Sequence, residues 1–266
     1  MAVTSPVATI TRAAWMADYW LAITKRTWKG SAVSSFVMPL LYVVALGVML
    51  GGFVHSTPAK LEGAGSYLEF VVPGLVASQA MQTMFGEMTY PILGRIQWDK
   101  TYFSMMATPL GVGEIVLATL AYAVFRVAIV CGVFFVVMAP FGVFHSVWGV
   151  FVAFLAQLLI GLAFATPLFA ISCGMKTDSG FSLLFRLAMT PLFLFSGAFF
   201  PISNLSDWME VVAKVTPLWQ GVDLTRMLVL GHIDGSRLVV HLVYLVALAA
   251  LGWWLSVVRL RKRMVA

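Results

Sequence analysis

Six apolar segments, each long enough to cross a bilayer, dominate this sequence. A transmembrane helix needs about 20 mostly apolar residues to cross about 30 Å of hydrocarbon. We expect the spans at approximately Ala32–Val54, Leu68–Leu93, Gly113–Ala139, Val147–Cys173, Gly180–Phe200 and Leu238–Val258. Only 11% of the residues are charged, whereas a soluble domain carries about 25%. The sequence therefore predicts an all-α integral membrane protein with six transmembrane helices.

The lysines and arginines predict how these spans are oriented. With the N-terminus inside, eleven of the 17 fall in inner segments, four in outer segments, and Arg126 and Arg186 within spans. Cytoplasmic loops carry the excess of such residues, so both termini are predicted to be cytoplasmic. The net charge of +6 lies at the two chain ends, which is not the pattern of a nucleic-acid-binding patch. Cys131 and Cys173 fall in opposite halves of the bilayer, and we expect no disulfide between them.

We expect one membrane domain, divided into a cytoplasmic amphipathic helix (1–31), the six-span region (32–258) and a basic cytoplasmic tail (259–266). Within the first part, Thr9–Gly30 has apolar residues including Trp20 on one side of a helical wheel and Asp18, Lys25 and Lys29 on the other. A basic helix of this kind lies in the membrane surface. The alternative is a flexible basic tail.

The longest predicted outer segment, Phe195–Gly231, is patterned as two short helices rather than as a simple turn. Ser206 or Asp207 is a candidate cap for the first, and Asp207 with Glu210 has the spacing of a capping box. Thr216-Pro217 separates the two helices, and Gly231 ends the second. Their apolar stripes are Trp208, Val211, Val212 and Val215, and then Leu218, Val222, Thr225 and Val229. Each piece of about ten residues spans roughly 15 Å, half a bilayer. This length favours re-entrant or interfacial helices, and the alternative is a small soluble loop.

The inner loop Gly94–Glu114 has the pattern of a docking element. Trp98–Ala107 is predicted to form a short helix that Thr108-Pro109 stops, since the residue before proline disfavours helical geometry. Tyr102, Met105 and Met106 give this helix apolar side chains, which we expect to be exposed. Held at the cytoplasmic face, such a helix suits docking of a partner. The alternative is an ordinary helix lying on the membrane.

Charged residues inside the spans need a partner or water. Arg126 lies near the middle of the third span, where a charge costs about 2.5–3.5 kcal/mol on insertion scales. Glu87 and Arg186 lie at matching depths in the inner halves of spans two and five, where they could pair. The alternative for both is to snorkel to the inner interface.

Polar residues recur on one side of spans two and five, next to these charges. The candidate translocation path comprises Gln79, Gln82, Thr83, Glu87, Arg126, Ser182, Arg186 and Thr190. A polar side of a membrane helix lines either a helix contact or a hydrated path. The residues alone leave both open, and the helix contact is the commoner outcome.

In their order, these features resemble the membrane subunit of type 2 ABC exporters, in the branch of nodulation-factor exporters and daunorubicin-resistance permeases. The likeness rests on the six spans, the preceding amphipathic helix, a TPL element in the inner loop, and an S-G-x-x-F-P…W…P-L…D-x-x-R signature before the last span. The matching positions are Thr108, Pro109, Leu110, Ser196, Gly197, Phe200, Pro201, Trp208, Pro217, Leu218, Asp223 and Arg226. The likeness covers nearly the whole chain.

This resemblance implies an assembly in the bacterial cytoplasmic membrane. Two membrane subunits, either a homodimer or this chain with a related paralogue, would bind two copies of a cytoplasmic ABC ATPase subunit. ATP and Mg would sit on the ATPase, and this chain would bind no cofactor or metal. The inner loop would carry the coupling helix, with contacts expected from Arg95, Trp98, Tyr102, Met105, Met106, Thr108 and Pro109.

The resemblance also assigns the outer helices and the path. The helices between spans five and six would be extracytoplasmic and re-entrant, marked by Pro201, Trp208, Pro217, Asp223 and Arg226. Spans two and five would face each other across the dimer, which favours the path interpretation of the two polar stripes.

The function expected is that of a permease subunit that exports an amphipathic substrate such as a lipid-linked glycan, a glycolipid or a hydrophobic drug. The chain has no G-x-x-x-x-G-K-[ST] motif, and its four histidines lack metal-ligand spacing. The alternatives are a membrane-embedded lipid-modifying enzyme, or a membrane anchor or gating subunit without transport.

Overall fold

The computed structural model describes residues 61–265, together with residues 19, 20, 22, 24–26, 36, 37, 40–42, 44 and 45. Most of the first predicted span and most of the predicted N-terminal helix lie outside these residues. The described part is helical, and it contains no strand. Its main helices are α3 (Tyr67–Met88), α4 (Tyr90–Gln97), α5 (Thr101–Met106), α6 (Val112–Met138), α7 (Val147–Gly174), α8 (Ser179–Leu184), α9 (Thr190–Phe195), α10 (Asp207–Val215), α11 (Pro217–Leu230) and α12 (Gly235–Val265).

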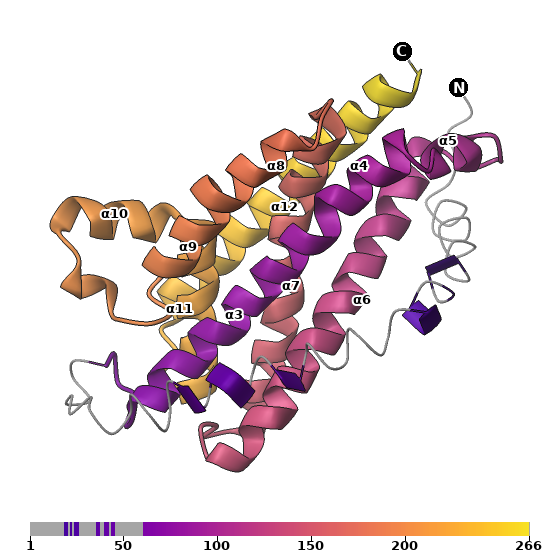
Figure 1. Cartoon of the computed structure of the whole chain (residues 1–266). Coiled ribbons are helices and arrows are strands. Elements are labelled where there is room, and N and C mark those ends of the chain that lie inside the picture. Colours follow the sequence, from indigo (N-terminus) through magenta and orange to yellow (C-terminus); the bar gives the residue numbers. More distant parts are fainter. Residues whose placement is uncertain are drawn as a thin grey trace.

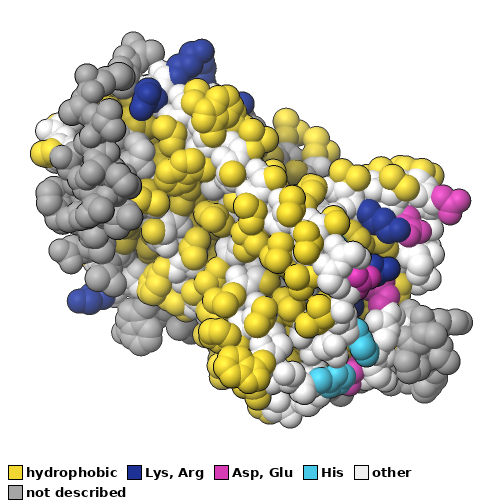
Figure 2. All heavy atoms as spheres, turned by 180° about the vertical axis from the view of Figure 1, so that it is seen from behind, with side chains coloured by type: hydrophobic (Ala, Val, Ile, Leu, Met, Phe, Trp, Pro, Cys, Tyr) yellow, Lys and Arg dark blue, Asp and Glu magenta, His cyan; other side chains and the backbone are white. Residues whose placement is uncertain are grey.

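The long helices run side by side as one bundle (Figure 1). Helix α7 lies at its centre and contacts α3, α6, α11 and α12. Helix α5 and the C-terminus lie at one end of the bundle, and α11 lies toward the other (Figure 1). We call these the α5 end and the α11 end. Hydrophobic side chains cover much of the surface between the ends in Figure 2.

Among the described residues, three helical segments are long and apolar enough to cross a membrane: Val112–Phe141, Val147–Gly174 and Gly235–Met264. They coincide with predicted spans three, four and six. The second predicted span is divided at Thr89 into α3 and α4, where Pro91 lies in the first turn of α4. The predicted fifth span forms a shorter apolar segment, Ser179–Phe195.

That fifth segment ends at Phe195 rather than at Phe200, and it is interrupted. A π-helical turn, η4 (Phe185–Met189), separates α8 from α9. Gly197 adopts a positive φ of 75°, a conformation that glycine takes without the steric cost of a Cβ atom. The carbonyls beyond the helix find donors elsewhere, since Tyr67 Oη donates to the Phe199 carbonyl at 3.0 Å. The chain can therefore leave the helix before Pro201.

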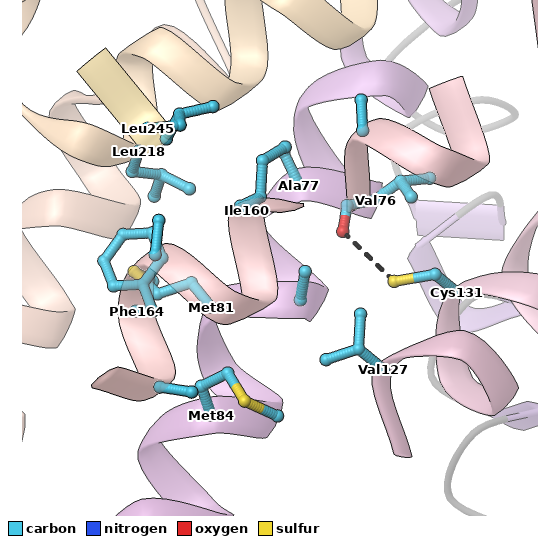
Figure 3. Close-up of a cluster of buried hydrophobic side chains, with 14 of the residues drawn as sticks. Val76, Ala77, Met81, Met84, Val127, Cys131, Ile160, Phe164, Leu218 and Leu245 are labelled. Atoms are coloured by element: carbon cyan, nitrogen blue, oxygen red, sulfur yellow. Dashed lines mark hydrogen bonds between the residues drawn. The ribbon is translucent and has the colours of Figure 1, made fainter. Parts of the chain in front are cut away.

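The core lies where α3, α6, α7, α11 and α12 meet (Figure 3). Met81 and Ile160 are fully buried there. The Cys131 thiol points to the Val76 carbonyl at 3.9 Å (Figure 3). Cys131 and Cys173 are both free and buried. The core thus combines side chains from helices that are distant in sequence.

Small residues let α12 approach α7 closely, as is common where membrane helices pack. A Cβ atom on Gly252 would lie 2.4 Å from Thr166 Oγ1 and 2.8 Å from the Pro167 nitrogen. One turn further along α12, Ser256 Oγ donates to the Thr166 carbonyl at 2.8 Å.

Substitution of Gly252 by alanine is expected to destabilise the protein by about 1–3 kcal/mol, because an added methyl group overpacks a contact that includes backbone atoms. Thermal unfolding of the purified chain measures this loss. Gly235→Ala, on the same helix, is the matched control because nothing lies within 4 Å of its added Cβ atom. Equal melting temperatures for the two variants would show that the α7–α12 contact is not tight.

The basic tail is attached to the end of α7. Arg259 donates to the Ala170 carbonyl at 3.2 Å, and Arg263 donates to the Cys173 and Met175 carbonyls at 3.3 and 2.8 Å. The last carbonyls of a helix have no partner within it, and cations are favoured there by the helix dipole. The C-terminal arginines therefore hold α12 and α7 together at the α5 end.

Candidate functional site

The loop at the α5 end differs from the predicted docking helix in two ways. Helix α4 runs to Gln97, so Trp98 caps α4 and does not begin the next helix. Lys100 then takes a positive φ of 52°, and the short helix that follows is only Thr101–Met106. Thr108 and Pro109 follow α5 as predicted. We call residues 94–109 the α4–α5 knob.

Tyr102 is buried, contrary to the expectation that it is exposed. Its hydroxyl lies 3.3 Å from Thr119 Oγ1 on α6, and burial raises its pKa. Met105 and Met106 are half-buried against the core. These three residues have the i, i+3, i+4 spacing of one helical face. That spacing indicates that the three side chains attach the knob to the bundle rather than form its exposed surface.

The large exposed apolar side chains of the knob are those of Trp98 and Phe103, whose exposed fractions are 60% and 45%. Trp98 was predicted as a contact residue, whereas Phe103 was not. Phe103 adjoins Tyr102 in sequence, and therefore lies about 100° away from it around the helix. Because the face of α5 that carries Tyr102 is buried, Phe103 points away from the bundle.

Described residues of the N-terminal segment, Trp20 among them, reach the knob. The Arg95 guanidinium lies 4.4 Å from the centroid of the Trp20 ring, and the Trp20 ring stacks on Tyr122 of α6 at 4.2 Å. Trp20 is 5% exposed. The sequence predicts Trp20 on the apolar side of the N-terminal helix, but it does not predict Tyr122 as the stacking partner. Arg95 therefore links the N-terminal segment to the knob.

The charges between the spans pair differently from the prediction. Arg126 Nε on α6 lies 2.9 Å from Glu87 Oε1 on α3. The proposed pairing of Glu87 with Arg186 is therefore wrong in this structure. The Glu87 and Arg126 side chains are 20% and 14% exposed. The two opposite charges compensate each other, and this offsets the free-energy cost of placing either one in a membrane.

The polar stripe of α3 lies on the less buried side of that helix. Gln79, Gln82, Thr83 and Glu87 are partly exposed, while the opposite residues such as Met84 are buried. The Gln82 side chain lies near the Tyr42 hydroxyl of the preceding segment. At least one position of this stripe is therefore a helix contact.

The stripe predicted on the fifth span faces away from the bundle. Ser182, Arg186 and Thr190 are all exposed. Arg186 lies within η4, and Thr190 Oγ1 donates to the Phe185 carbonyl five residues earlier at 3.1 Å. Turns of π-helix inside α-helices are rare and frequent at functional sites. This row of polar side chains is therefore not covered by the described residues of the chain.

At the α11 end, Arg226 contacts three residues that are distant from it in the sequence: Glu62, Phe70 and Gly197. It is 3% exposed and forms an ion pair with Glu62. Its Nη2 donates to the Gly197 carbonyl at 2.7 Å, and its guanidinium lies 4.0 Å from the ring of Phe70. The S-G and D-x-x-R parts of the sequence signature therefore meet at one side chain.

Helices α10 and α11 begin and end close to the predicted residues. Ser206 is the N-cap of α10, but no side-chain hydrogen bond forms there. Asp207 is already helical, so the predicted Asp207–Glu210 capping box is wrong; Glu210 pairs with Lys214 at 2.6 Å instead. The apolar stripe of α10, including Trp208, is exposed.

Helix α11 is longer than the ten residues expected. It runs from Pro217 to Leu230, about 21 Å at 1.5 Å per residue. Thr216 caps it by accepting from the Trp219 amide at 3.3 Å. The predicted stripe from Leu218 to Val229 is buried, and so is most of the helix. Helix α11 is therefore packed among α3, α7 and α12.

A cavity of about 570 Å³ opens at the α11 end. Asp223 lines it, with its carboxylate 2.9 Å from His241 Nε2 on α12. Acidic and histidine side chains gather toward this end in Figure 2. Pro201 is buried near its edge, next to Ile202, which lines the cavity. Among the described residues, no group of three or more His, Cys, Asp or Glu side chains could hold a metal ion.

Comparison with known proteins decides the family. A family described as "ABC-2 type transporter" matches residues 13–230, which is most of the chain. The chain belongs to the ABC-2 type transporter family. Members of this family are transport subunits in membranes and are not themselves enzymes; they work with an ABC ATPase. This ABC-2 chain is therefore a multi-pass inner-membrane transport permease.

Similar curated proteins agree with this assignment. The ABC-2 chain is 31% identical to nodulation protein J of Rhizobium leguminosarum bv. trifolii, over 92% of this chain and 94% of the relative. It is 30% identical to nodulation protein J of Rhizobium meliloti, with the same coverage. The inner membrane transport permease YadH of Escherichia coli is 23% identical, over 88% of this chain and 94% of the relative.

Proposed function

We propose that this chain is the permease subunit of an ATP-driven exporter of an amphipathic substrate, such as a lipid-linked glycan, a glycolipid or a hydrophobic drug. Two copies of a separate ATPase subunit bind ATP and Mg and dock at the α5 end, which faces the cytoplasm. The α11 end is extracytoplasmic. A second permease chain, identical or a related paralogue, completes the path.

The observation that carries this proposal is the construction of the α4–α5 knob. Tyr102, Met105 and Met106 fix its inner face to the bundle, while Trp98 and Phe103 remain exposed. Aromatic side chains in the centre of an interface supply much of its binding energy. A rigidly held knob also transmits force, because its anchor on Thr119 connects it directly to α6. These are the properties that coupling to an ATPase requires.

The proposed path lies along α3 and the α8–α9 segment. The row formed by Ser182, Arg186 and Thr190 is exposed, and a charged side chain facing lipid would be costly. A second permease chain or the path itself would give Arg186 a polar environment. The Glu87–Arg126 pair lies on the neighbouring helices at the side of the same stripe.

Substitution Arg186→Ala tests the path. We expect it to lower substrate-stimulated ATPase activity of the assembled transporter about tenfold, the change that results from about 1.4 kcal/mol of lost interaction. The ATPase activity is measured in nanodiscs, with a substrate that a transport assay has identified. Arg237→Ala, at an exposed position on α12, is the matched control. Unchanged stimulation by Arg186→Ala would remove Arg186 from the path without affecting the docking proposal.

A further inference from the structure

Helix α10 lies at the side of the bundle next to α9 (Figure 1), between two hollows of opposite character. Glu210 and Lys214, one turn apart, line the polar cavity of about 570 Å³. Trp208, Met209 and Val212 line a second hollow, a groove of about 450 Å³ between α10 and α9. At about 100° per residue, these two sets lie on nearly opposite sides of the helix. Helix α10 therefore separates a polar hollow from an apolar one.

The α9–α10 groove is lined by apolar side chains from both of its walls. Residues of η4 and α9, such as Leu187 and Phe195, form the wall opposite α10. Thr216 supplies the one polar side chain among the described residues that line the groove. Trp208 and Val212 are 69% and 57% exposed, so the described part of the chain does not cover them. The groove therefore offers a surface for an apolar chain.

The polar cavity holds several charges, but each lysine and arginine among its described lining residues has a carboxylate partner. The pairs are Arg226 with Glu62, Lys214 with Glu210, and Arg237 with Asp234. The fourth carboxylate, Asp223, lies 2.9 Å from His241 Nε2 and also interacts with Arg226. A phosphate or another anionic group would find no free lysine or arginine in this lining, and burying a charge without a partner is costly. The cavity therefore suits an uncharged group.

Hydrogen-bond acceptors are plentiful in the same lining. A carboxylate has about four acceptor positions, so the paired carboxylates keep free lone pairs. The hydroxyl of Ser203 can donate or accept, and Trp219 adds an aromatic ring with a single N–H. This lining fits a head group that donates from several hydroxyl groups and carries no net charge.

The cavity and the groove come close to each other at the junction of α10 and α11. Ala213 and Thr216 line the groove, whereas Lys214 and Trp219 line the cavity. The Trp219 amide donates to Thr216 Oγ1 at 3.3 Å, so residues of the two linings are in direct contact. One molecule that lies across this end of α10 would reach both hollows.

We infer that α10 divides a binding site for an amphipathic molecule with an uncharged, hydroxyl-bearing head and an apolar chain. The head lies in the polar cavity, and the chain lies in the α9–α10 groove. The inference rests on the proposed function for its side of the membrane, because that function makes the α11 end extracytoplasmic. Arg237 and Asp234 are 68% and 51% exposed, and they stand at the rim of the cavity rather than against the head.

Photo-cross-linking of the full chain in phosphatidylcholine nanodiscs tests this site. The probe is dodecyl maltoside with a diazirine at the end of its alkyl chain, and mass spectrometry locates the cross-links. We expect them in the groove wall formed by residues 207–216, and an excess of unlabelled dodecyl maltoside should remove most of them. The same excess of dodecyl phosphate or dodecyltrimethylammonium, which carry charged heads on the same chain, should leave most of them in place.

Cross-links around Trp254 provide an internal reference. Trp254 is 60% exposed on α12 and reports on probe dissolved in the bilayer, so its labelling should change little with any competitor. If labelling of the groove and of Trp254 fell together, the probe would only be dissolved in lipid and the proposal would be overturned. Competition by a charged head as strong as that by maltoside would overturn it as well.

Two pairs of variants test the two hollows separately. Val212→Gln should lower cross-linking in the groove about fourfold, the effect of about one methylene group losing its apolar contact. Val211→Gln is its matched control, because Val211 is 62% exposed on α10 but does not line the groove. Ser203→Phe, which fills part of the cavity, should lower cross-linking about tenfold by crowding the head. Asn204→Phe, at an exposed position outside the cavity lining, should not.

Equal labelling of each variant and its control would contradict the divided site. That result would leave docking of an ATPase at the α5 end unaffected, because the cross-linking needs no ATPase. Conversely, a chain that bound the maltoside in this way but was recovered from its host without an ATPase would contradict the proposed function and not the site.

Discussion

Replacing Arg226 by methionine is expected to destabilise the protein by about 2–4 kcal/mol, because hydrogen bonds to a charged group contribute about 1.5–3 kcal/mol each. The guanidinium is 3% exposed, and its loss leaves Glu62 without its cation. The Gly197 carbonyl, which accepts from Arg226 at 2.7 Å, would lose this donor as well. Because Arg226 joins α11, the turn after α9 and the start of α3, all three connections should loosen together.

The free energy of unfolding in mixed detergent micelles measures this effect. Arg237→Met is the matched control, because Arg237 pairs with Asp234 at the same end of the bundle but its side chain is 68% exposed. An exposed pair contributes about 0–1 kcal/mol, so the control should remain near the wild type. If both variants lost the same small amount, Arg226 would not be a central connection of this end.

Glutamate at Trp98 or Phe103 is expected to weaken binding of the ATPase subunit about 30-fold, equivalent to about 2 kcal/mol for a central aromatic contact. These side chains are 60% and 45% exposed, so a charge there is solvated in the free chain and should not disturb folding. In the assembled complex it would be buried without a partner. Each single substitution should therefore separate the subunits while the permease still enters the membrane.

The affinity of the purified permease for its ATPase, measured by titration in detergent, checks this result. Trp208→Glu is the matched control, since Trp208 is 69% exposed but belongs to α10 near the opposite end. It should leave the affinity unchanged. Wild-type affinity for both knob variants would contradict docking through Trp98 and Phe103. Charges at Met105 and Met106, which are half-buried, would test anchoring of the knob as well as docking.

Local chemistry explains which elements could be predicted from the sequence. Thr216-Pro217 and Gly231 mark the two ends of α11 as predicted, because a capping hydroxyl, a proline and a glycine act within their own turn. The spans that became α6, α7 and α12 were found from length and apolarity alone. The early end of α9 was missed because Tyr67 and Arg226, both distant in sequence, satisfy the carbonyls of the turn.

The candidate site likewise combines features that local sequence patterns predict with features that depend on the packing of distant segments. Helical spacing already placed Tyr102, Met105 and Met106 on one face, yet judging that face as buried required knowing that α6 lies against it. The pairing of Glu87 with Arg126 depends on α3 and α6 being neighbours, and matching depth alone favoured Arg186. Arg226 was recognised only as a position in a signature. Its contacts with Glu62 and Gly197 arise from chain packing that no local pattern contains.

The most direct measurement is purification of the tagged chain from its native host in mild detergent, with quantitative mass spectrometry of the proteins that accompany it. The proposed function predicts an ABC ATPase subunit carrying a G-x-x-x-x-G-K-[ST] motif, at one copy per permease chain. It also predicts that this subunit is lost from the Phe103→Glu variant. A stable wild-type chain recovered without any such ATPase would contradict the account of this protein as an ATP-driven permease.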